Sequence, residues 1–284
     1  QIAKRPKTFQ VLTPLENKEN IMTDYNCSLA ELIINACAEA WRDDGELMAT
    51  GIGPLPRLGA SLAKVSFNPL LQLTDGENYY ADAPVPPGKR HAEPVYEGYA
   101  NYDRVFSALW GGRRHSMVSP VQLDRFGQAN ISTIGDRAAP KVAMLGARGF
   151  PGNSIYHPNS FFIPNHSTRS LVADEVDFVC MAGYNPERYL NGTPPKGLDL
   201  RIIVSDLCVM DFNGPDKAIR VVSLHPGVSF ELVQENTGFE LSKASDTLTL
   251  TPAPSEAHMA LLGTLDPNNV RESVLKDNPP AIRD

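Results

Sequence analysis

One arginine, Arg148, stands inside a glycine-rich turn, with Gly146 before it and Gly149, Gly152 and Asn153 after it. Glycines let backbone N–H groups approach an anion or a developing oxyanion without a Cβ in the way. A planar guanidinium in such a turn can hold a carboxylate or phosphate through two parallel hydrogen bonds. On glycine content alone, a tight turn with a surface arginine is the better interpretation. Whether this turn binds an anion therefore has to be judged from the rest of the chain.

Two further polar turns carry groups that could work with this arginine. Asp75 and Glu77 offer carboxylates, and Asn130 offers a neutral amide. Ordinary turn chemistry is the better explanation for the two acids, because Asp-Gly is a common turn dipeptide. For Gln128 and Asn130 the sequence leaves two interpretations open, a ligand contact or hydrogen bonds within their own loop.

Each polar turn follows a short apolar run that is typical of a buried strand: residues 70–73, 117–121 and 142–145. If these strands are parallel neighbours, the turns meet at the carboxyl edge of the sheet, where open α/β folds bind their ligands. The hypothesis is therefore a cleft in which Arg148 is the catalytic cation. The substrate-binding residues expected around it are Asp75, Glu77, Asn130, Gly146, Gly149 and Asn153.

Other chemistry-bearing residues give weaker signals. The run from Trp110 to His115 contains two arginines that could meet an anion, although the C-terminus of a helix attracts cations in any case. The histidines show no metal-ligand spacing, so no metal site is expected. A Ser-His-Asp arrangement stays open, but no Gly-x-Ser-x-Gly turn supports it.

The remaining elements indicate a layered α/β domain with a mostly parallel sheet covered by helices. Ser28 and Glu31 form a capping box for a helix that is expected to end near Gly45. A second helix should bury Leu58, Leu62 and Val65, and a third, over residues 101–110, should turn Val105, Phe106, Leu109 and Trp110 inward. Further strands are predicted at 161–163, 176–180, 202–204, 208–210 and 219–222, and further helices at 230–234, 255–265 and 268–276.

Length and composition restrict the class of protein. The chain has 284 residues, 42% of them hydrophobic, which suits one large domain or two small ones. The net charge of -7 argues against nucleic-acid binding, and no apolar run approaches the roughly 20 residues of a membrane span. Residues 1–21 are polar and patternless and are expected to form an extension outside a domain of residues 22–284. Four scattered cysteines favour a reduced, cytoplasmic protein.

Several of these segments resemble known motifs. Asp124 to Ser132 resembles the D-R-x-G-N-x-N-x-S segment of class I CoA-transferase β subunits. His225 to Ser229, followed by Thr237 to Phe239, is similar to their H-P-G-V-T and T-G-F signatures. Within that family, the β subunits of steroid-ring-opening hydrolases are more similar still. The resemblance runs from about Ser28 to Arg271, and the segments shared with these hydrolases are 73–77, 110–115, 148–153 and 212–216.

The resemblance implies a class I CoA-transferase-like fold and an enzyme that works only with an α subunit, as an α2β2 heterotetramer. It implies cleavage of a carbon–carbon bond in a cyclic keto acyl-CoA of cholesterol or bile acid C/D-ring degradation. The essential glutamate would lie in the α subunit, Arg148 would come from this chain, and no cofactor beyond the CoA thioester of the substrate is expected. Transferases carry a nucleophilic glutamate where this chain has Asp75, and one methylene of displacement can cost about 100-fold in rate. A transferase using Asp75 or Glu77, or a non-catalytic scaffold subunit, are the alternatives.

Overall fold

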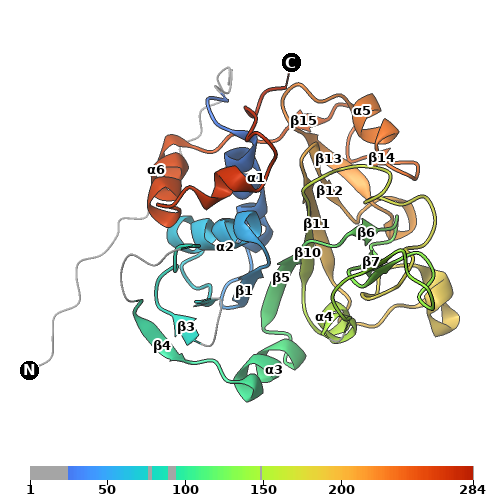
Figure 1. Ribbon diagram of the computed structural model, residues 1–284, viewed down its shortest axis with the longest axis horizontal. Helices are drawn as coiled ribbons and strands as arrows, with labels where there is room; N and C mark the ends of the chain where they lie inside the picture. Colours follow the sequence, from blue (N-terminus) through green and yellow to red (C-terminus); the bar gives the residue numbers. More distant parts are fainter. Residues whose placement is uncertain (1–24, 76–78, 89–93, 148, 284) are drawn as a thin grey trace, which may run out of the picture.

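The computed structural model describes residues 25–75, 79–88, 94–147 and 149–283. The expected extension over residues 1–21 lies outside this part of the chain. The described residues are organised around one eight-stranded sheet with strand order β1-β5-β10-β11-β12-β13-β14, in which β15 pairs with β13 (Figure 1). The strands are β1 (Met48–Gly51), β5 (Arg114–Val118), β10 (Asn159–Ile163), β11 (Leu200–Ser205), β12 (Cys208–Asp211), β13 (Arg220–Leu224), β14 (Ser242–Lys243) and β15 (Thr249–Leu250).

The sheet is mostly parallel, as the sequence predicts. Strands β1, β5, β10 and β11 run parallel to one another, and β14 and β15 run parallel to β13. Only β12 is antiparallel to both of its neighbours. It follows β11 after two residues, which is the short connection that antiparallel strands allow.

The helices and the smaller sheets complete the layers. The helices are α1 (Leu29–Ala38), α2 (Pro54–Ser66), α3 (Tyr102–Trp110), α4 (Phe150–Tyr156), α5 (Phe230–Glu235) and α6 (Glu256–Leu265). Short 3-10 turns are η1 (Glu39–Trp41), η2 (Pro186–Arg188), η3 (Leu190–Gly192), η4 (Pro215–Lys217) and η5 (Val270–Ser273). The small sheets contain β2 (Leu73–Thr74), β3 (Tyr79–Ala81) and β4 (Tyr96–Tyr99), then β6 (Gln122–Leu123) with β7 (Ala129–Asn130), and β8 (Thr133–Ile134) with β9 (Val142–Ala143).

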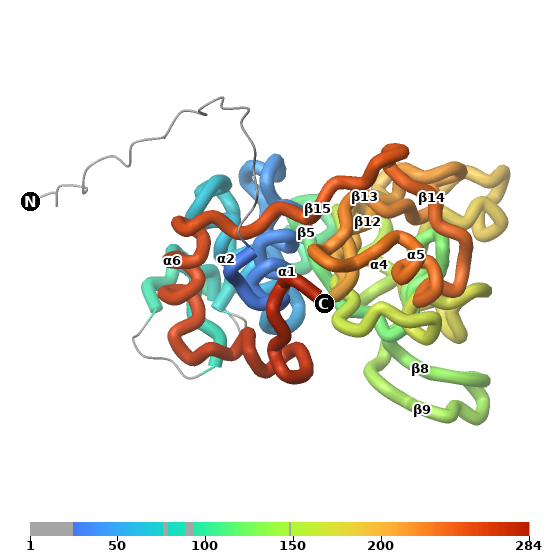
Figure 2. Tube along the Cα trace, turned by 90° about the horizontal axis from the view of Figure 1, so that it is seen from above, coloured from blue at the N-terminus to red at the C-terminus, as the bar shows by residue number. Residues whose placement is uncertain are grey.

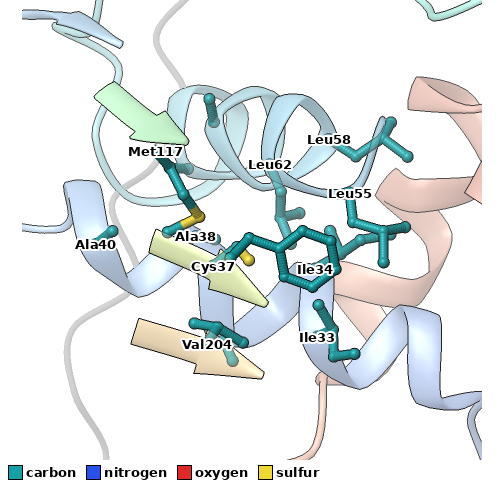
Figure 3. Packing of buried hydrophobic residues seen from close by; sticks show 14 of the residues in the cluster. Ile33, Ile34, Cys37, Ala38, Ala40, Leu55, Leu58, Leu62, Met117 and Val204 are labelled. Atoms are coloured by element: carbon teal, nitrogen blue, oxygen red, sulfur yellow. The ribbon is translucent and has the colours of Figure 1, made fainter. Parts of the chain in front are cut away.

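One face of the main sheet is covered by α1, α2 and α6 (Figure 1). The capping box of Ser28 and Glu31 starts α1 as predicted, and the helix ends at Ala38, earlier than Gly45. Nine of its ten residues are buried because it lies between the sheet and α2. Figure 3 shows this core, in which leucines of α2 meet Ile34 and Cys37 of α1. Such close packing makes this layer the rigid support for the loops at the edge of the sheet.

The other face carries a second core, built from strands β10 to β13, the β6–β7 hairpin, α5 and long connections. The predicted strand at 176–180 is wrong, because this segment has no regular strand. Hydrogen bonds from the N–H groups of Asp177 and Cys180, and a bridge between Ala129 and Met181, tie it to the hairpin. The strands predicted at 161–163, 202–204, 208–210 and 219–222 are confirmed within one or two residues.

Three predictions of burial are wrong for the same physical reason. The apolar run 142–145 is exposed, with Leu145 at 74%, and only Val142 and Ala143 pair, in a β8–β9 arm that projects from the body (Figure 2). In α3, Leu109 is buried but Phe106 and Trp110 are exposed and stack on each other. Likewise Val65 of α2 is exposed. Apolar periodicity identifies a face that avoids water but does not say whether this chain covers it.

Candidate functional site

A pocket of about 510 Å³ opens where β1 passes into α2. Its walls come from both of these elements, from β2, from the loop 85–87, from α3 and from Arg114 at the start of β5. This volume lies within the range of small-molecule sites. β1 was not predicted from the sequence, because its four residues are too few to show a period.

Two glycines shape the turn from β1 to α2. A Cβ on Gly51 would lie 2.2 Å from the backbone carbon of Pro56, so only glycine fits there. Gly53 has φ +99°, a conformation that favours glycine, and Pro54 then starts the helix. Gly53 provides no side-chain cap, and because Pro54 and Pro56 have no N–H, Leu55 is the only one of the first three residues of this 13-residue helix that carries an N–H donor.

Two arginines contribute to the same walls. Arg114 donates from Nε to Oγ1 of Thr50 at 3.0 Å, and burial lowers its pKa to about 10, so it stays charged at pH 7. Arg57 donates from Nη2 to the carbonyl oxygens of Asp75 and Val85 at 3.1 and 2.9 Å. No aspartate or glutamate belongs to the described lining. The pocket therefore favours an anionic ligand with apolar parts.

Asp75 lies beside this pocket but is not one of its lining residues. It is 4% exposed, and its Oδ1 accepts a hydrogen bond from the backbone N–H of Tyr79 at 3.2 Å. Its own N–H donates to the carbonyl of Tyr79 at 3.0 Å. This carboxylate therefore closes the turn between β2 and β3, which is the ordinary role that the sequence favours. Glu77 lies outside the described residues.

Asn130 makes its side-chain hydrogen bonds close to its own loop, and Gln128 bonds both within this loop and to Glu175 at 2.7 Å. Asn130 donates from Nδ2 to Gln122 and to the carbonyl of Thr133, both at 2.7 Å. Gln128 donates to Asp124 at 2.7 Å, and burial raises the pKa of Asp124 to about 6. Both amides are buried, so they brace the loop, and a substrate contact by Asn130 stays a prediction.

The glycine turn behaves differently, because nothing in the described chain crowds it. A Cβ on Gly146 or Gly149 would have no atom within 4 Å, and neither residue has a positive φ. Asn153 follows in α4; it is 7% exposed, and its Oδ1 has no hydrogen-bond partner among the described residues. Arg148 itself lies outside the described residues. Packing within the chain gives no reason for glycine here, which leaves room for a ligand or partner.

The structure brings only two of the three predicted turns together. Gln128 and Pro151 line a second pocket of about 330 Å³, and Ala182 in its wall donates its N–H to Oγ of Ser154 at 3.1 Å. Asp75 lies at the first pocket instead. The prediction that the turns follow neighbouring parallel strands is wrong for two of the three turns, because β2 and β9 belong to small antiparallel sheets. The run 117–121 does overlap the parallel strand β5, and the chain then enters the antiparallel β6–β7 hairpin. Two-residue strands that pair locally cannot be distinguished from sheet strands by an apolar run.

A Ser-His-Asp chain does exist, at residues that line neither pocket. His115 Nε2 lies 2.8 Å from Ser160 Oγ, and His115 Nδ1 lies 2.7 Å from Asp44 Oδ2. Burial lowers the pKa of His115. Burial opposes ionisation of Asp44, but its hydrogen bond with His115 and the charge of Arg201 keep its pKa below the usual value. Ser160 and His115 have no exposed surface, so no substrate can reach the hydroxyl.

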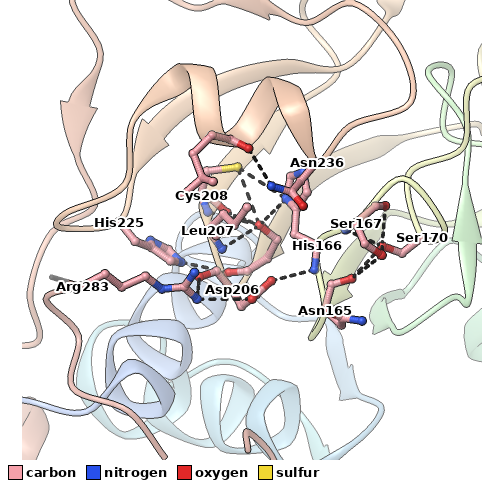
Figure 4. Close-up of polar contacts among 12 residues, drawn as sticks. Asn165, His166, Ser167, Ser170, Asp206, Leu207, Cys208, His225, Asn236 and Arg283 are labelled. Carbon is pink, nitrogen blue, oxygen red and sulfur yellow. Dashed lines mark hydrogen bonds and ion pairs between the residues drawn. The ribbon is translucent and has the colours of Figure 1, made fainter.

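A second buried network joins the end of β11 to the C-terminal part of the chain (Figure 4). His166 contacts Oγ of Ser205 and Oγ1 of Thr237, both at 2.9 Å. His225 contacts the carbonyl of Ser205 and Oγ1 of Thr251, also at 2.9 Å. Burial lowers the pKa of both histidines to about 4, so they are neutral at pH 7 and structural.

Neither a metal centre nor a membrane span is found within the described residues. They hold no group of three or more His, Cys, Asp or Glu side chains able to bind a metal ion. Among them, too, no helix is long and apolar enough to cross a membrane.

Known proteins are similar to this chain over most of its length. It is 38% identical over 248 residues to the IpdB subunit of the cholesterol ring-cleaving hydrolase of Rhodococcus jostii, covering 86% of this chain and 94% of that one. It is 30% identical over 261 residues to a subunit of the 3-oxoadipate CoA-transferase of Pseudomonas knackmussii, covering 84% and 93%. The crystal structure of Rhodococcus jostii IpdAB matches with a TM-score of 0.81 and 35% identity over 88% of this chain and 99% of that chain.

No family model matches the sequence. The relatives nevertheless cover most of the chain, and the matched structure agrees with the predicted fold class. The chain belongs to the family that includes the IpdB subunits of cholesterol ring-cleaving hydrolases and the β subunits of CoA-transferases.

Proposed function

We propose that this chain is the β subunit of a heteromeric hydrolase that opens a ring of a cyclic keto acyl-CoA during steroid C/D-ring degradation. The observation that carries the proposal is 38% identity to a subunit named for cholesterol ring cleavage, over 94% of that subunit's length. The IpdAB structure that this chain matches supports an α partner subunit. We place the two in an α2β2 heterotetramer, in the cytoplasm, where the four unpaired cysteines would stay reduced.

The reaction needs charge stabilisation rather than a redox step. Water adds to the ring ketone, the adjacent carbon–carbon bond breaks, and the products are a carboxylate and an enolate that takes up a proton. Arg148 and the N–H groups of the glycine turn would stabilise the negative charge on oxygen. The base that activates water would be a glutamate of the α subunit. The CoA thioester is part of the substrate, and we propose no further cofactor.

The environment of Asp75 supports hydrolysis over CoA transfer. A transferase nucleophile must reach the thioester. Asp75, by contrast, is 4% exposed, and its carboxylate accepts a hydrogen bond from the N–H of Tyr79. Its side chain is also one methylene shorter than the glutamate of transferases, and a displacement of about 1 Å can cost 100-fold in rate. The 30% identity to a transferase subunit keeps CoA transfer as the second candidate.

Exposed apolar side chains support a partner chain. Val142, Met144 and Leu145 on the projecting β8–β9 arm are 48%, 36% and 74% exposed, and the glycine turn that carries Arg148 follows directly (Figure 2). A partner seated on this arm would complete the site next to the arginine. A pure scaffold would not need Gly146 and Gly149 where the chain has space for larger residues.

The function is tested with the co-expressed α and β subunits, a cyclic keto acyl-CoA and water, with and without an acceptor acid such as acetate. We expect a ring-opened acyl-CoA with one oxygen from labelled water, no acetyl-CoA, and no turnover by this chain alone. Asp75→Asn keeps the acceptor for Tyr79 and should retain turnover within about threefold, since the carboxylate is given no chemical role. CoA transfer to acetate, or borohydride labelling of Asp75 or Glu77, would instead establish a transferase.

The buried Ser-His-Asp chain gives a separate prediction. Ser160→Ala should leave turnover within about threefold, because no substrate reaches this hydroxyl. Stability should fall by about 1–3 kcal/mol, since His115 loses its partner in the core. Loss of a true serine nucleophile costs about a millionfold in kcat. Steady-state rates and urea unfolding of the assembled complex separate the two roles.

A further inference from the structure

One buried amide, that of Asn130, holds both ends of the β8–β9 arm. Its Oδ1 accepts the backbone N–H of Ser132 at 2.9 Å and that of Thr133 at 3.4 Å, and its Nδ2 donates to the carbonyl of Thr133 at 2.7 Å. Ser132 stands just before β8, and its carbonyl accepts the N–H of Met144, just after β9, at 2.7 Å. Asn130 therefore fixes the point at which the arm leaves the body and the point at which it returns.

The same amide is connected to supports outside the arm. Oε1 of Gln122 accepts a hydrogen bond from Nδ2 of Asn130 at 2.7 Å and another from the N–H of Asp177 at 3.0 Å. Oδ2 of Asp177 in turn accepts the N–H of Gly135, further along the arm, at 2.7 Å. The thiol of Cys180 lies 3.6 Å from Oδ1 of Asn130. The arm is thus anchored to the β6–β7 hairpin and to the segment 177–180.

The glycine turn depends on this anchor because it has little packing of its own. A Cβ on Gly146, which follows Met144 by two residues, or on Gly149 would have no atom within 4 Å. On its other side the turn passes into α4, where Oγ of Ser154 accepts the N–H of Ala182 at 3.1 Å. So loosely packed a turn takes its position from its two ends.

We propose that Asn130 is a positioning residue for ring opening: it holds the glycine turn, and with it Arg148, in register with the reacting oxygen. The inference rests on the proposed function for the role of Arg148, while the anchor stands on the hydrogen bonds of Asn130. Asn130 is fully buried and lines neither pocket, so its effect on the rate must pass through other residues. A displacement of about 1 Å at the reacting group can cost 100-fold in rate.

Hydrogen exchange of the assembled complex measures the anchor without using activity. Asn130→Ala should raise amide exchange by at least about tenfold in peptides that cover residues 132–144. The reason is that the N–H groups of Ser132 and Thr133 lose their acceptor, and the bond from Met144 to Ser132 loses its support. The rest of the chain should exchange as in wild type.

Asn35→Ala is the matched control for loss of a buried asparagine. Asn35 is 6% exposed, donates to the carbonyl of Pro252 at 3.2 Å and contacts Nδ1 of His258 at 2.8 Å. It lies in α1, on the opposite face of the main sheet from the hairpin that carries Asn130. Asn35→Ala should therefore lower stability but leave exchange of the arm unchanged.

A double-mutant cycle then tests whether Asn130 acts through Arg148. Asn130→Ala should lower kcat about 10- to 100-fold and leave KM within about threefold, because the turn is displaced while the substrate loses no contact. In the Arg148→Ala background the same change should cost less than about threefold, because the group that it positions is gone. Asn35→Ala should stay within about threefold in both backgrounds.

Asp177→Ala carries the test if Asn130→Ala does not assemble. Asp177 is exposed, so its truncation leaves the core intact and removes the support of Gly135. Exchange should rise around Gly135, and kcat should fall by about three- to tenfold, again only while Arg148 is present. Unchanged exchange and unchanged kcat in this variant would reject the inference.

The remaining outcomes are equally decisive. Unchanged exchange of the arm in an assembled Asn130→Ala complex means that the anchor is wrong. A loss of rate that is as large without Arg148 as with it, or that appears in KM, overturns the positioning role; the second result would indicate a direct substrate contact. Raised exchange in the arm, with no ring opening even by the wild-type complex, keeps the anchor and rejects the proposed function.

Discussion

Arg148→Ala should lower kcat/KM of the assembled complex by about 100- to 1000-fold. An arginine in a glycine turn offers charge-assisted, bidentate hydrogen bonds to the oxyanion or carboxylate of the reacting group. Loss of one preorganised donor for transition-state charge costs roughly 3–4 kcal/mol. Around this position the turn has the necessary space, because a Cβ on Gly146 or Gly149 would meet no atom of the described chain.

The comparison requires variants that separate charge from geometry. Arg148→Lys retains the charge but not the planar fork, so it should restore little of the rate. Arg169→Ala is the control for loss of an exposed arginine, which typically changes free energies by about 0–1 kcal/mol. Assembly is checked by co-purification and by the melting temperature. If Arg148→Ala assembles and turns over within about threefold of wild type, the assignment of Arg148 is wrong and the reacting group must be held elsewhere.

Much of the fold could be predicted because its signals are local. The capping box of Ser28 and Glu31 and the buried stripe of α1 lie within one helix. Strands β10 to β13 are apolar enough to be recognised one by one. The run 142–145 has the same composition but lies on an exposed arm, because an apolar run can also be covered by a second chain.

The candidate site was harder to predict because its parts are distant in sequence. Arg114 reaches Thr50 across 64 positions, and the pocket depends on β1, whose four residues have no clear period. His115 meets Ser160 and Asp44 at separations of 45 and 71 positions, which no spacing rule anticipates. Asp75 and Asn130 were found by residue type, but their hydrogen bonds show turn and loop roles that type alone leaves open.

Acid should destabilise the fold steeply between about pH 6.5 and pH 4. Burial lowers the pKa of His157, His166 and His225 to about 4, whereas unfolded histidines titrate at about 6.5. Between these values the unfolded chain binds more protons than the native one, so the free energy of unfolding falls as the pH falls, and it is flat above about pH 7. At pH 4.5 each histidine then lowers the free energy of unfolding by about 2–3 kcal/mol relative to pH 7. The total free energy of unfolding of a domain is typically about 5–15 kcal/mol.

Two acids, Asp124 and Asp206, work in the opposite direction, because burial raises the pKa of each. Burial raises the pKa of Asp124 to about 6, so its contribution to stability is present at low pH and is lost as the pH rises through the range 4 to 6. This offsets the effect of roughly one histidine. Asp44 and Asp211, whose pKa values are lowered by their hydrogen-bond and ion-pair partners despite burial, reinforce the acid sensitivity. Destabilisation by acid should therefore prevail.

Urea unfolding of the complex at pH 7.5, 6.5, 5.5 and 4.5 measures the effect, and two variants assign it to the network of Figure 4. His166→Gln removes a titrating ring, so its stability should vary with pH by about 2–3 kcal/mol less than that of wild type. Thr237→Val removes a hydrogen-bond partner of His166 but leaves the ring. It should therefore lower the free energy of unfolding at every pH and leave its dependence on pH unchanged. Equal slopes for wild type and His166→Gln would mean that His166 titrates normally. The ring would then be hydrated, and the junction of β11 with α5 would have to open in the native state.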